Sequence, residues 1–240
     1  MKDILFIHGA YHAGWCWDEV IKLLPPDKFT CHAIDLPGQG KNQAIPKNKI
    51  KTQNYVDYTL DYIEQNNLTS TVVISHSLGG VTLSKIIELI PEKISQAFFL
   101  TSVILDGSSF LEKFPEEVRK KYKQIAQERE DGSIPPNIER IKQLLFSGSK
   151  DSSELEGFLA KLEPQPISPY LEVINLNDFK KTSVPVTYIK CSKDNSLPAE
   201  TFNEIFSNLP QNAQIIEIDA NHEAMFSNPK AVAEILLRKA

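Results

Sequence analysis

The sequence has 240 residues, of which 41% are hydrophobic and 24% charged, and its formal net charge at pH 7 is −5. This length and composition suit one domain with a sizeable core. The negative charge excludes nucleic acid as an expected partner, because phosphates would be repelled. The sequence also lacks a run of about 18 apolar residues that could cross a membrane.

Apolar segments of strand length alternate with segments of helical length. We expect strands at residues 4–8, 30–35, 71–75, 97–102, 186–191 and 214–218. Helices are expected at residues 18–24, 52–66, 77–90, 198–207 and 229–239. This alternation predicts an α/β fold with a mostly parallel six-stranded sheet and helices on both faces. Residues 106–182 interrupt it, which predicts a core of 1–105 and 183–240 with a helical cap insertion at 106–182.

A serine follows the third predicted strand in the run TVVISHSLGG, residues 71–80. A strand, a tight turn and a helix in succession are typical of a nucleophile elbow, which holds a serine hydroxyl clear of the sheet. The residues two before and two after Ser77 must then be small, and they are Ser75 and Gly79. Ser75 replaces the usual glycine. The alternative is an ordinary turn rich in serine and glycine.

An acid and a histidine follow in the order that this elbow requires, serine, then acid, then histidine. Asp194 comes after the strand at 186–191, and His222 comes after the strand at 214–218. Because the carboxyl ends of parallel strands meet at one edge of a sheet, we expect both side chains beside Ser77. Taken alone, Asp194 could cap the helix near residue 198 and His222 could be a surface residue.

Two other acids compete with Asp194 for the contact with His222. Asp106 follows the strand at 97–102, and Asp219 lies three residues before His222. Asp219 is too close along the chain to fold back onto the far nitrogen of the imidazole. Asp194 fits the required order, and the family resemblance described below also favours it.

The loop after the first strand is a candidate oxyanion hole. Gly9 allows a sharp turn of the backbone. The backbone N–H groups of Ala10 and of Leu78, the residue after the serine, could then face a developing oxyanion. This expectation depends on position alone.

Four segments carry a resemblance to a known family: FIHGAYHAGWCW (6–17), ISHSLGG (74–80), CSKDNSLP (191–198) and ANHEAM (220–225). They resemble the α/β-hydrolase superfamily. More narrowly, they are similar to the branch that holds plant methylesterases, including the methyl salicylate esterase that binds salicylic acid, and the hydroxynitrile lyases. The resemblance implies that Ser77, Asp194 and His222 are a catalytic triad.

The same resemblance favours ester hydrolysis over cyanohydrin cleavage. Lyases of this branch carry a lysine directly after the catalytic histidine and a threonine in the first loop. Glu223 and Ala10 occupy those places here. We therefore expect a serine esterase for small, largely apolar esters, such as methyl or aryl esters. A hydroxynitrile lyase-type enzyme and a non-catalytic small-ligand receptor on the same fold stay open.

The cap should roof an apolar pocket, and we expect Phe110 and Phe146 to line it with His12 at its mouth. No metal or organic cofactor is expected, and the expected partner is a small-molecule ester. A homodimer is left open. The three cysteines, Cys16, Cys31 and Cys191, are interpreted as buried packing residues without metal-ligand spacing. Their number and the strand at the start of the chain predict a cytoplasmic protein without a signal peptide.

Overall fold

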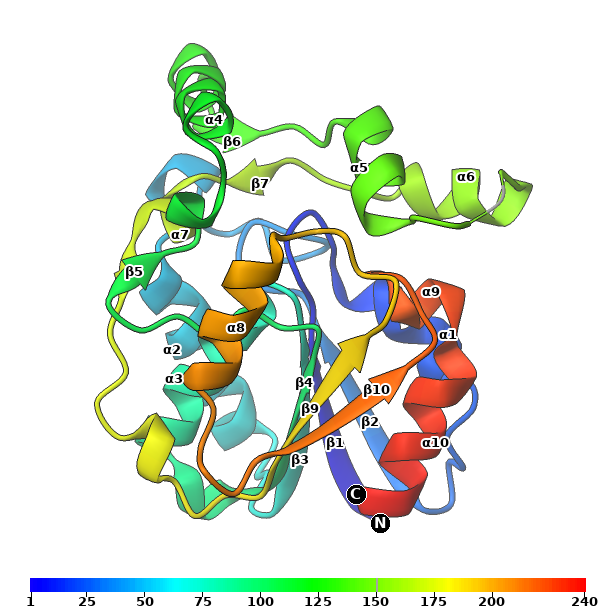
Figure 1. Ribbon diagram of the computed structural model, residues 1–240. Coiled ribbons are helices and arrows are strands. Elements are labelled where there is room, and N and C mark those ends of the chain that lie inside the picture. Colours follow the sequence, from blue (N-terminus) through cyan, green and yellow to red (C-terminus); the bar gives the residue numbers. More distant parts are fainter. Residues whose placement is uncertain (150) are drawn as a thin grey trace.

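The computed structural model describes residues 1–149 and 151–240, and a twisted sheet of six parallel strands forms its centre (Figure 1). The strands are β1 (Lys2–Ile7), β2 (Phe29–Ile34), β3 (Thr71–His76), β4 (Ile94–Leu100), β9 (Val186–Cys191) and β10 (Gln214–Ile218). They lie in the order β10-β9-β4-β3-β1-β2, and each neighbouring pair is parallel. All six residues of β3 are buried, as expected for a central strand covered on both faces. The predicted α/β architecture is confirmed.

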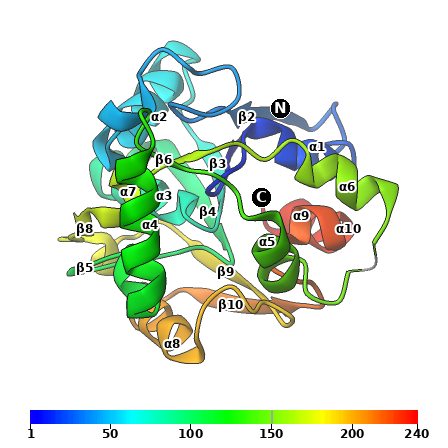
Figure 2. The ribbon, with the colours of Figure 1, turned by 90° about the horizontal axis from the view of Figure 1, so that it is seen from above.

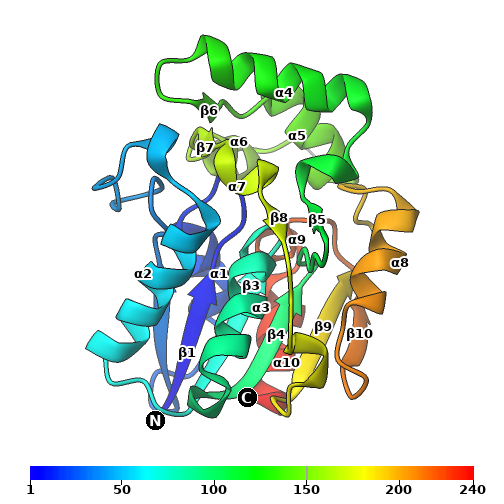
Figure 3. The same cartoon turned by 90° about the vertical axis from the view of Figure 1, so that its left-hand side faces the viewer.

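Helices cover both faces of the sheet. On one face lie α2 (Thr52–Gln65), α3 (Gly79–Leu89) and α8 (Ala199–Ser207), and on the other α1 (Asp18–Ile21), α9 (Ala224–Ser227) and α10 (Pro229–Lys239) (Figures 1 and 3). Alternate strand residues supply two cores, because successive side chains of a strand point to opposite faces. Leu5 and Ile7 pack with the first group of helices, whereas Ile4 and Phe6 pack with the second.

Residues 106–182, which we call the cap segment, connect β4 to β9 over the carboxyl ends of the strands (Figure 1). It contains α4 (Glu116–Glu128), α5 (Ile138–Leu145), α6 (Ser153–Leu159) and α7 (Ser168–Leu171). Seen from above, α4 lies on the side of α3 and α7, whereas α5 lies nearer to α9 and α10 (Figure 2). Two short antiparallel pairs brace the segment: β5 (Ser108–Ser109) with β8 (Val173–Ile174), and β6 (Ser133–Ile134) with β7 (Gln165–Pro166).

Short 3-10 turns complete the chain: η1 (Gly14–Trp17), η2 (Lys47–Lys49), η3 (Pro91–Lys93), η4 (Leu111–Lys113) and η5 (Phe179–Lys181). Phe179 belongs to the cap segment in sequence, yet it is fully buried in the core of the sheet. The helix expected at 18–24 is shorter in the structure, where α1 ends at Ile21. Pro25 and Pro26 follow, and a proline disfavours helical geometry in the residue before it. None of the described helices has the length and apolar character that crossing a bilayer requires.

Candidate active site

The turn after β3 holds Ser77 in a strained conformation. Its φ angle is 49°, in the left-handed region that non-glycine residues rarely adopt. The helix that follows packs closely against the neighbouring loops. A Cβ at Gly79 would lie 2.6 Å from the carbonyl oxygen of His8, and one at Gly80 would lie 2.6 Å from that of Val103. The two glycines therefore permit the sharp turn that exposes the serine.

Ser75 stands where a glycine is usual, and its side chain is accommodated by Ser102, which lies in the loop after β4. Its buried hydroxyl lies 3.0 Å from the Ser102 hydroxyl, which also donates a 3.0 Å hydrogen bond to the Ser75 carbonyl. The extra polar atom is thus satisfied inside the protein, as burial requires.

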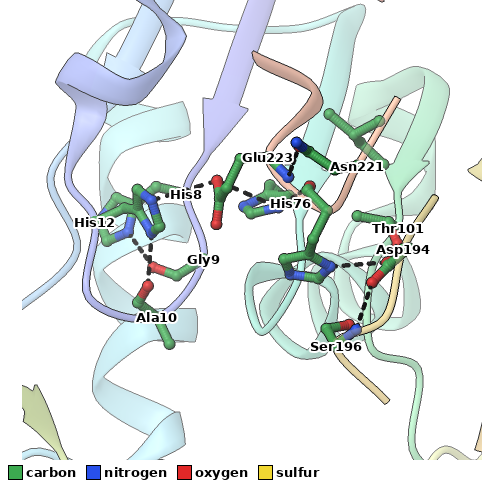
Figure 4. A network of polar contacts seen from close by, with 12 residues as sticks. His8, Gly9, Ala10, His12, His76, Thr101, Asp194, Ser196, Asn221 and Glu223 are labelled. Carbon is green, nitrogen blue, oxygen red and sulfur yellow. Dashed lines mark hydrogen bonds and ion pairs between the residues drawn. The ribbon is translucent and has the colours of Figure 1, made fainter. Parts of the chain in front are cut away.

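The histidine and the acid meet at the carboxyl ends of β9 and β10. His222 Nδ1 lies 2.8 Å from Asp194 Oδ2. The second carboxylate oxygen accepts a 2.8 Å hydrogen bond from the Ser196 backbone N–H, and the Thr101 hydroxyl donates to Oδ2. Asp194 is therefore held by three donors, of which Thr101 and Ser196 are labelled beside it in Figure 4. Its carboxylate fixes the ring of His222.

Burial and the attraction between Asp194 and His222 shift the pKa values of these two residues in opposite directions. Burial raises the pKa of Asp194, but the positive charge and hydrogen bond of His222 reverse the effect and leave it lowered. Burial likewise lowers the pKa of His222, and Asp194 reverses this so that it is raised. Since Nδ1–H donates to Asp194, neutral His222 keeps an unprotonated Nε2.

The competing acids lie in other contacts. Asp106 Oδ1 accepts a hydrogen bond from the backbone N–H of Leu176 at 3.0 Å. Asp219 pairs with Lys193 at 2.6 Å and is largely exposed. The structure thus brings Asp194 to His222 and places Asp106 and Asp219 elsewhere.

The loop between β1 and η1, residues 8–13, is here called the oxyanion loop. A Cβ at Gly9 would lie 2.9 Å from the Ser77 Cβ, so only glycine lets the loop approach the elbow this closely. Tyr11 has a φ of 67°, and its N–H donates to Gln165 Oε1 at 3.1 Å. Within residues 1–149 and 151–240, the N–H groups of Ala10 and Leu78 donate to no protein acceptor. Both remain available to an oxyanion.

One pocket opens onto Ser77 and His222 beneath the cap segment. Ala10 and Phe110 line it, together with the apolar side chains of Phe114, Ile141, Leu144, Leu145 and Leu197. Asn137 and Arg140 bring polar groups from the start of α5. The cavity is thus mainly apolar with a few polar groups, as is usual for small-molecule sites.

Two expected pocket residues lie outside this lining. Phe146 is buried beside Phe158 and Phe226, with ring centroids 5.4 Å and 5.5 Å away, so it fastens α5 to α6 and α9. His12 belongs to the oxyanion loop and is 2% exposed, and its Nδ1 lies 2.6 Å from the carbonyl oxygen of Ala10. A helix pattern shows that a residue is apolar, but not whether it meets a ligand or a neighbouring helix.

The sequence reasoning missed a buried polar cluster of His12, His76 and Glu223, of which His76 and Glu223 also line the pocket. Glu223 is completely buried, with Oε2 3.4 Å from His12 Nε2 and 3.9 Å from His76 Nε2. Burial raises the pKa of Glu223 to about 7. Its position after His222 gave no local signal of burial, which results from the loops that enclose it.

The described residues contain one group of potential metal ligands. His76, His222 and Glu223 offer atoms within 4.8 Å of one another. However, His222 is hydrogen-bonded to Asp194, and His76 Nε2 lies 3.1 Å from the His222 carbonyl oxygen. A metal would compete with both contacts. The three cysteines are free, and Cys31 is only half-buried, contrary to expectation, because its side chain lies on the edge strand β2.

The model of the alpha/beta hydrolase family matches residues 4–235. The chain belongs to this family. Among curated relatives of this alpha/beta hydrolase, putative methylesterase 11 of Arabidopsis thaliana is 29% identical, with all of the chain covering 64% of that protein. Methylesterase 9 of the same plant is 26% identical over all of the chain and 98% of its own length.

Solved structures repeat the fold of this alpha/beta hydrolase. An extracellular alpha/beta-hydrolase from a Paenibacillus species has a TM-score of 0.88 at 22% identity, over 99% of this chain and 98% of its own. A methylesterase from Arabidopsis has a TM-score of 0.77 at 23% identity, over 99% and 98%. At these identities the likeness demonstrates the shared fold.

Proposed function

We propose that this alpha/beta hydrolase is a serine carboxylic ester hydrolase acting on small, largely apolar esters. The single observation that carries the proposal is the 2.8 Å contact between His222 Nδ1 and Asp194 Oδ2, with His222 and Ser77 lining the same pocket. The methylesterase relatives support ester hydrolysis as the class of reaction.

In this mechanism His222 Nε2 takes the proton of Ser77 as the hydroxyl attacks the ester carbonyl. Asp194 fixes the tautomer of the imidazole and stabilises the imidazolium. The N–H groups of Ala10 and Leu78 hold the oxyanion of the tetrahedral intermediate. The alcohol leaves with the proton from His222, and water then attacks the acyl-enzyme by the same route.

The pocket supports the substrate class. Phe110, Phe114 and the leucines of α5 offer apolar surface to an acyl or alcohol group. Arg140 and Asn137 lie in the same lining and can orient a polar substituent. Methyl and aryl esters of small acids fit this combination. We also propose the cytoplasm as the location, which the free thiols of the three cysteines support.

The test is turnover of p-nitrophenyl acetate and butyrate, followed by a panel of methyl and aryl esters. Purified protein should release p-nitrophenol, and Ser77→Ala should reduce the rate to that of buffer. Mandelonitrile should give no benzaldehyde above the uncatalysed rate. Benzaldehyde release that requires Ser77, without ester turnover, would contradict the proposal in favour of a lyase.

A further inference from the structure

The hydrogen bonds of the buried histidines reveal where their protons lie. His8 Nδ1 lies 2.8 Å from the Gly9 carbonyl oxygen, so it must donate, whereas Nε2 accepts a 3.0 Å hydrogen bond from the Leu36 N–H. His8 is therefore neutral with its proton on Nδ1. The pKa of His8 agrees, since burial lowers it to about 4.

The same reasoning applies to His12. Its Nδ1 lies 2.6 Å from the carbonyl oxygen of Ala10, which can only accept, so Nδ1 carries a proton. Burial lowers the pKa of His12 to about 3, which leaves Nε2 as an unprotonated acceptor. This Nε2 has no hydrogen-bond partner among the described residues, apart from the carboxyl group of Glu223 3.4 Å away.

Glu223 is the only group placed to supply the missing donor within the described residues. Both of its carboxyl oxygens are buried, and neither has a hydrogen-bond donor there. An ionised Glu223 would put a negative oxygen against the lone pair of His12 Nε2. A protonated Glu223 would instead donate to that lone pair. The Glu223–His12 distance is that of an ion pair, but burial disfavours both a carboxylate and an imidazolium here. Both side chains are therefore neutral while Glu223 keeps its proton.

We propose that Glu223 is a positioning residue that, through a proton shared with His12, links the loop of His222 to the oxyanion loop. Residues 219–223, the histidine loop, carry both His222 and Glu223. From Glu223 the connection runs through His12 to the carbonyl of Ala10, whose N–H faces the pocket in the proposed mechanism (Figure 4). This inference rests on the proposed ester hydrolysis for its catalytic consequence.

The titratable groups that face Glu223 come from several elements, but only His222 and Asp194 act on its pKa through their charge. His76 faces it from the end of β3 at 3.9 Å, and neutral His76 adds no charge, since burial lowers its pKa well below the usual value. The charge of His222 lowers the pKa of Glu223, and Asp194 raises it. The nearby thiols, Cys16 and Cys191, stay protonated because burial raises the pKa of each.

The link should therefore open as the pH rises through about 7. At pH 8 roughly one tenth of Glu223 molecules keep the proton. An ionised Glu223 can only accept a hydrogen bond, so His12 must then carry its proton on Nε2 instead of Nδ1. With Nδ1 unprotonated, His12 no longer donates to the carbonyl oxygen of Ala10. Wild-type kcat for a p-nitrophenyl ester should rise at low pH as His222 loses its proton, reach a maximum near pH 7 and fall severalfold by pH 8.

The decisive variant is Glu223→Gln, whose amide N–H can donate to His12 Nε2 at every pH. It should match wild-type kcat within about threefold at pH 6.5 and keep that activity at pH 8. Glu223→Leu, which cannot donate, should lose at least tenfold in kcat at pH 6.5 with little change in KM. At pH 8, where wild type has mostly lost the link, the same variant should lie within a few fold of wild type. Glu217→Gln removes the same charge from the exposed face of β10 and should behave as wild type.

A spectroscopic readout separates this inference from the proposed activity. Imidazole ¹⁵N resonances should show His12 with Nδ1 protonated at pH 6, and its Nε2 signal should move with a midpoint near 7 in wild type but not in Glu223→Gln. This holds whether or not any ester is hydrolysed. A His12 protonated on Nε2 throughout would overturn the inference, as would a Glu223→Gln variant with the wild-type pH profile. A lack of ester turnover in wild type would overturn only the proposed function.

Discussion

At the scale of single residues, the environment of Asp194 distinguishes it from the other acids near the site. Three donors converge on its buried carboxylate, whereas Asp106 binds a backbone N–H and Asp219 pairs with an exposed lysine. An acid that is buried and already aligned with an imidazole can hold one tautomer of that ring.

Asp194→Asn should lower kcat by a factor of about 10⁴, because asparagine presents an N–H to Nδ1 and favours the wrong tautomer. The pKa of His222 should fall as well, since Asp194 is what raises it. The measurement is kcat for p-nitrophenyl butyrate across pH 5–9, with unfolding in urea as a check on folding. Asp106→Asn is the control and should stay within a few fold of wild type. The reverse ranking would assign the acid to Asp106.

Ser77 and His222 should behave as one unit. Ser77→Ala and His222→Ala each disable the same proton transfer, so the double variant should be little slower than either single one. The three variants are compared with wild type by kcat for one ester under identical conditions. If the two losses multiply instead, the residues act in separate steps and the triad assignment is wrong.

At the scale of elements, close approach between loops determines the geometry that the sequence alone could only suggest. The space available for a Cβ differs between two glycines that look similar in the sequence. A Cβ added at Gly9 would lie 2.9 Å from His76 Nδ1 and from the Ser77 Cβ, whereas a Cβ added at Gly157 in α6 would meet open space. The same substitution should therefore have opposite effects at the two positions.

Gly9→Ala should destabilise the protein by about 1–3 kcal/mol, because the new methyl group overpacks a rigid turn. It should also reduce kcat, since relief of the clash displaces either the oxyanion loop or Ser77. Gly157→Ala, in an exposed helix, should stabilise by about 0.5–1 kcal/mol and leave kcat unchanged. Urea unfolding and ester kinetics on both variants test this contrast. A Gly9→Ala variant as stable and active as wild type would show that the oxyanion loop moves freely.

The elements themselves could largely be predicted from the sequence, since β9 and β10 begin and end where the apolar runs do. Helix α3 begins at Gly79, two residues later than expected, because the left-handed Ser77 cannot be helical. The pairs β5–β8 and β6–β7 have two residues per strand, which is too short for a periodic pattern. Long-range packing, which local patterns do not encode, determines where the side chains of Phe146, His12 and Glu223 lie.

At the scale of the whole molecule, buried titratable groups should set the pH range of greatest stability. Burial lowers the pKa of His8 to about 4 and of His12 to about 3. Their folded values lie below the unfolded value of 6.5, so the stability they contribute is present above pH 6.5 and is lost as the pH falls. The contribution of Glu223 to stability changes with pH in the opposite direction. Its folded pKa of about 7 exceeds the ordinary 4.5, so its contribution is present below pH 4.5 and is lost as the pH rises to 7.

Replacing Glu223 with glutamine should isolate the second of these effects. A shift from 4.5 to about 7 corresponds to a loss of about 3 kcal/mol between those pH values, and glutamine does not titrate. The free energy of unfolding of Glu223→Gln relative to wild type should therefore rise by about 2–3 kcal/mol between pH 5 and pH 8. Urea titrations at intervals of half a pH unit measure it, with Glu217→Gln as the control on an exposed carboxylate. Parallel curves for Glu223→Gln and wild type would mean that Glu223 ionises as easily in the folded protein as in the unfolded chain.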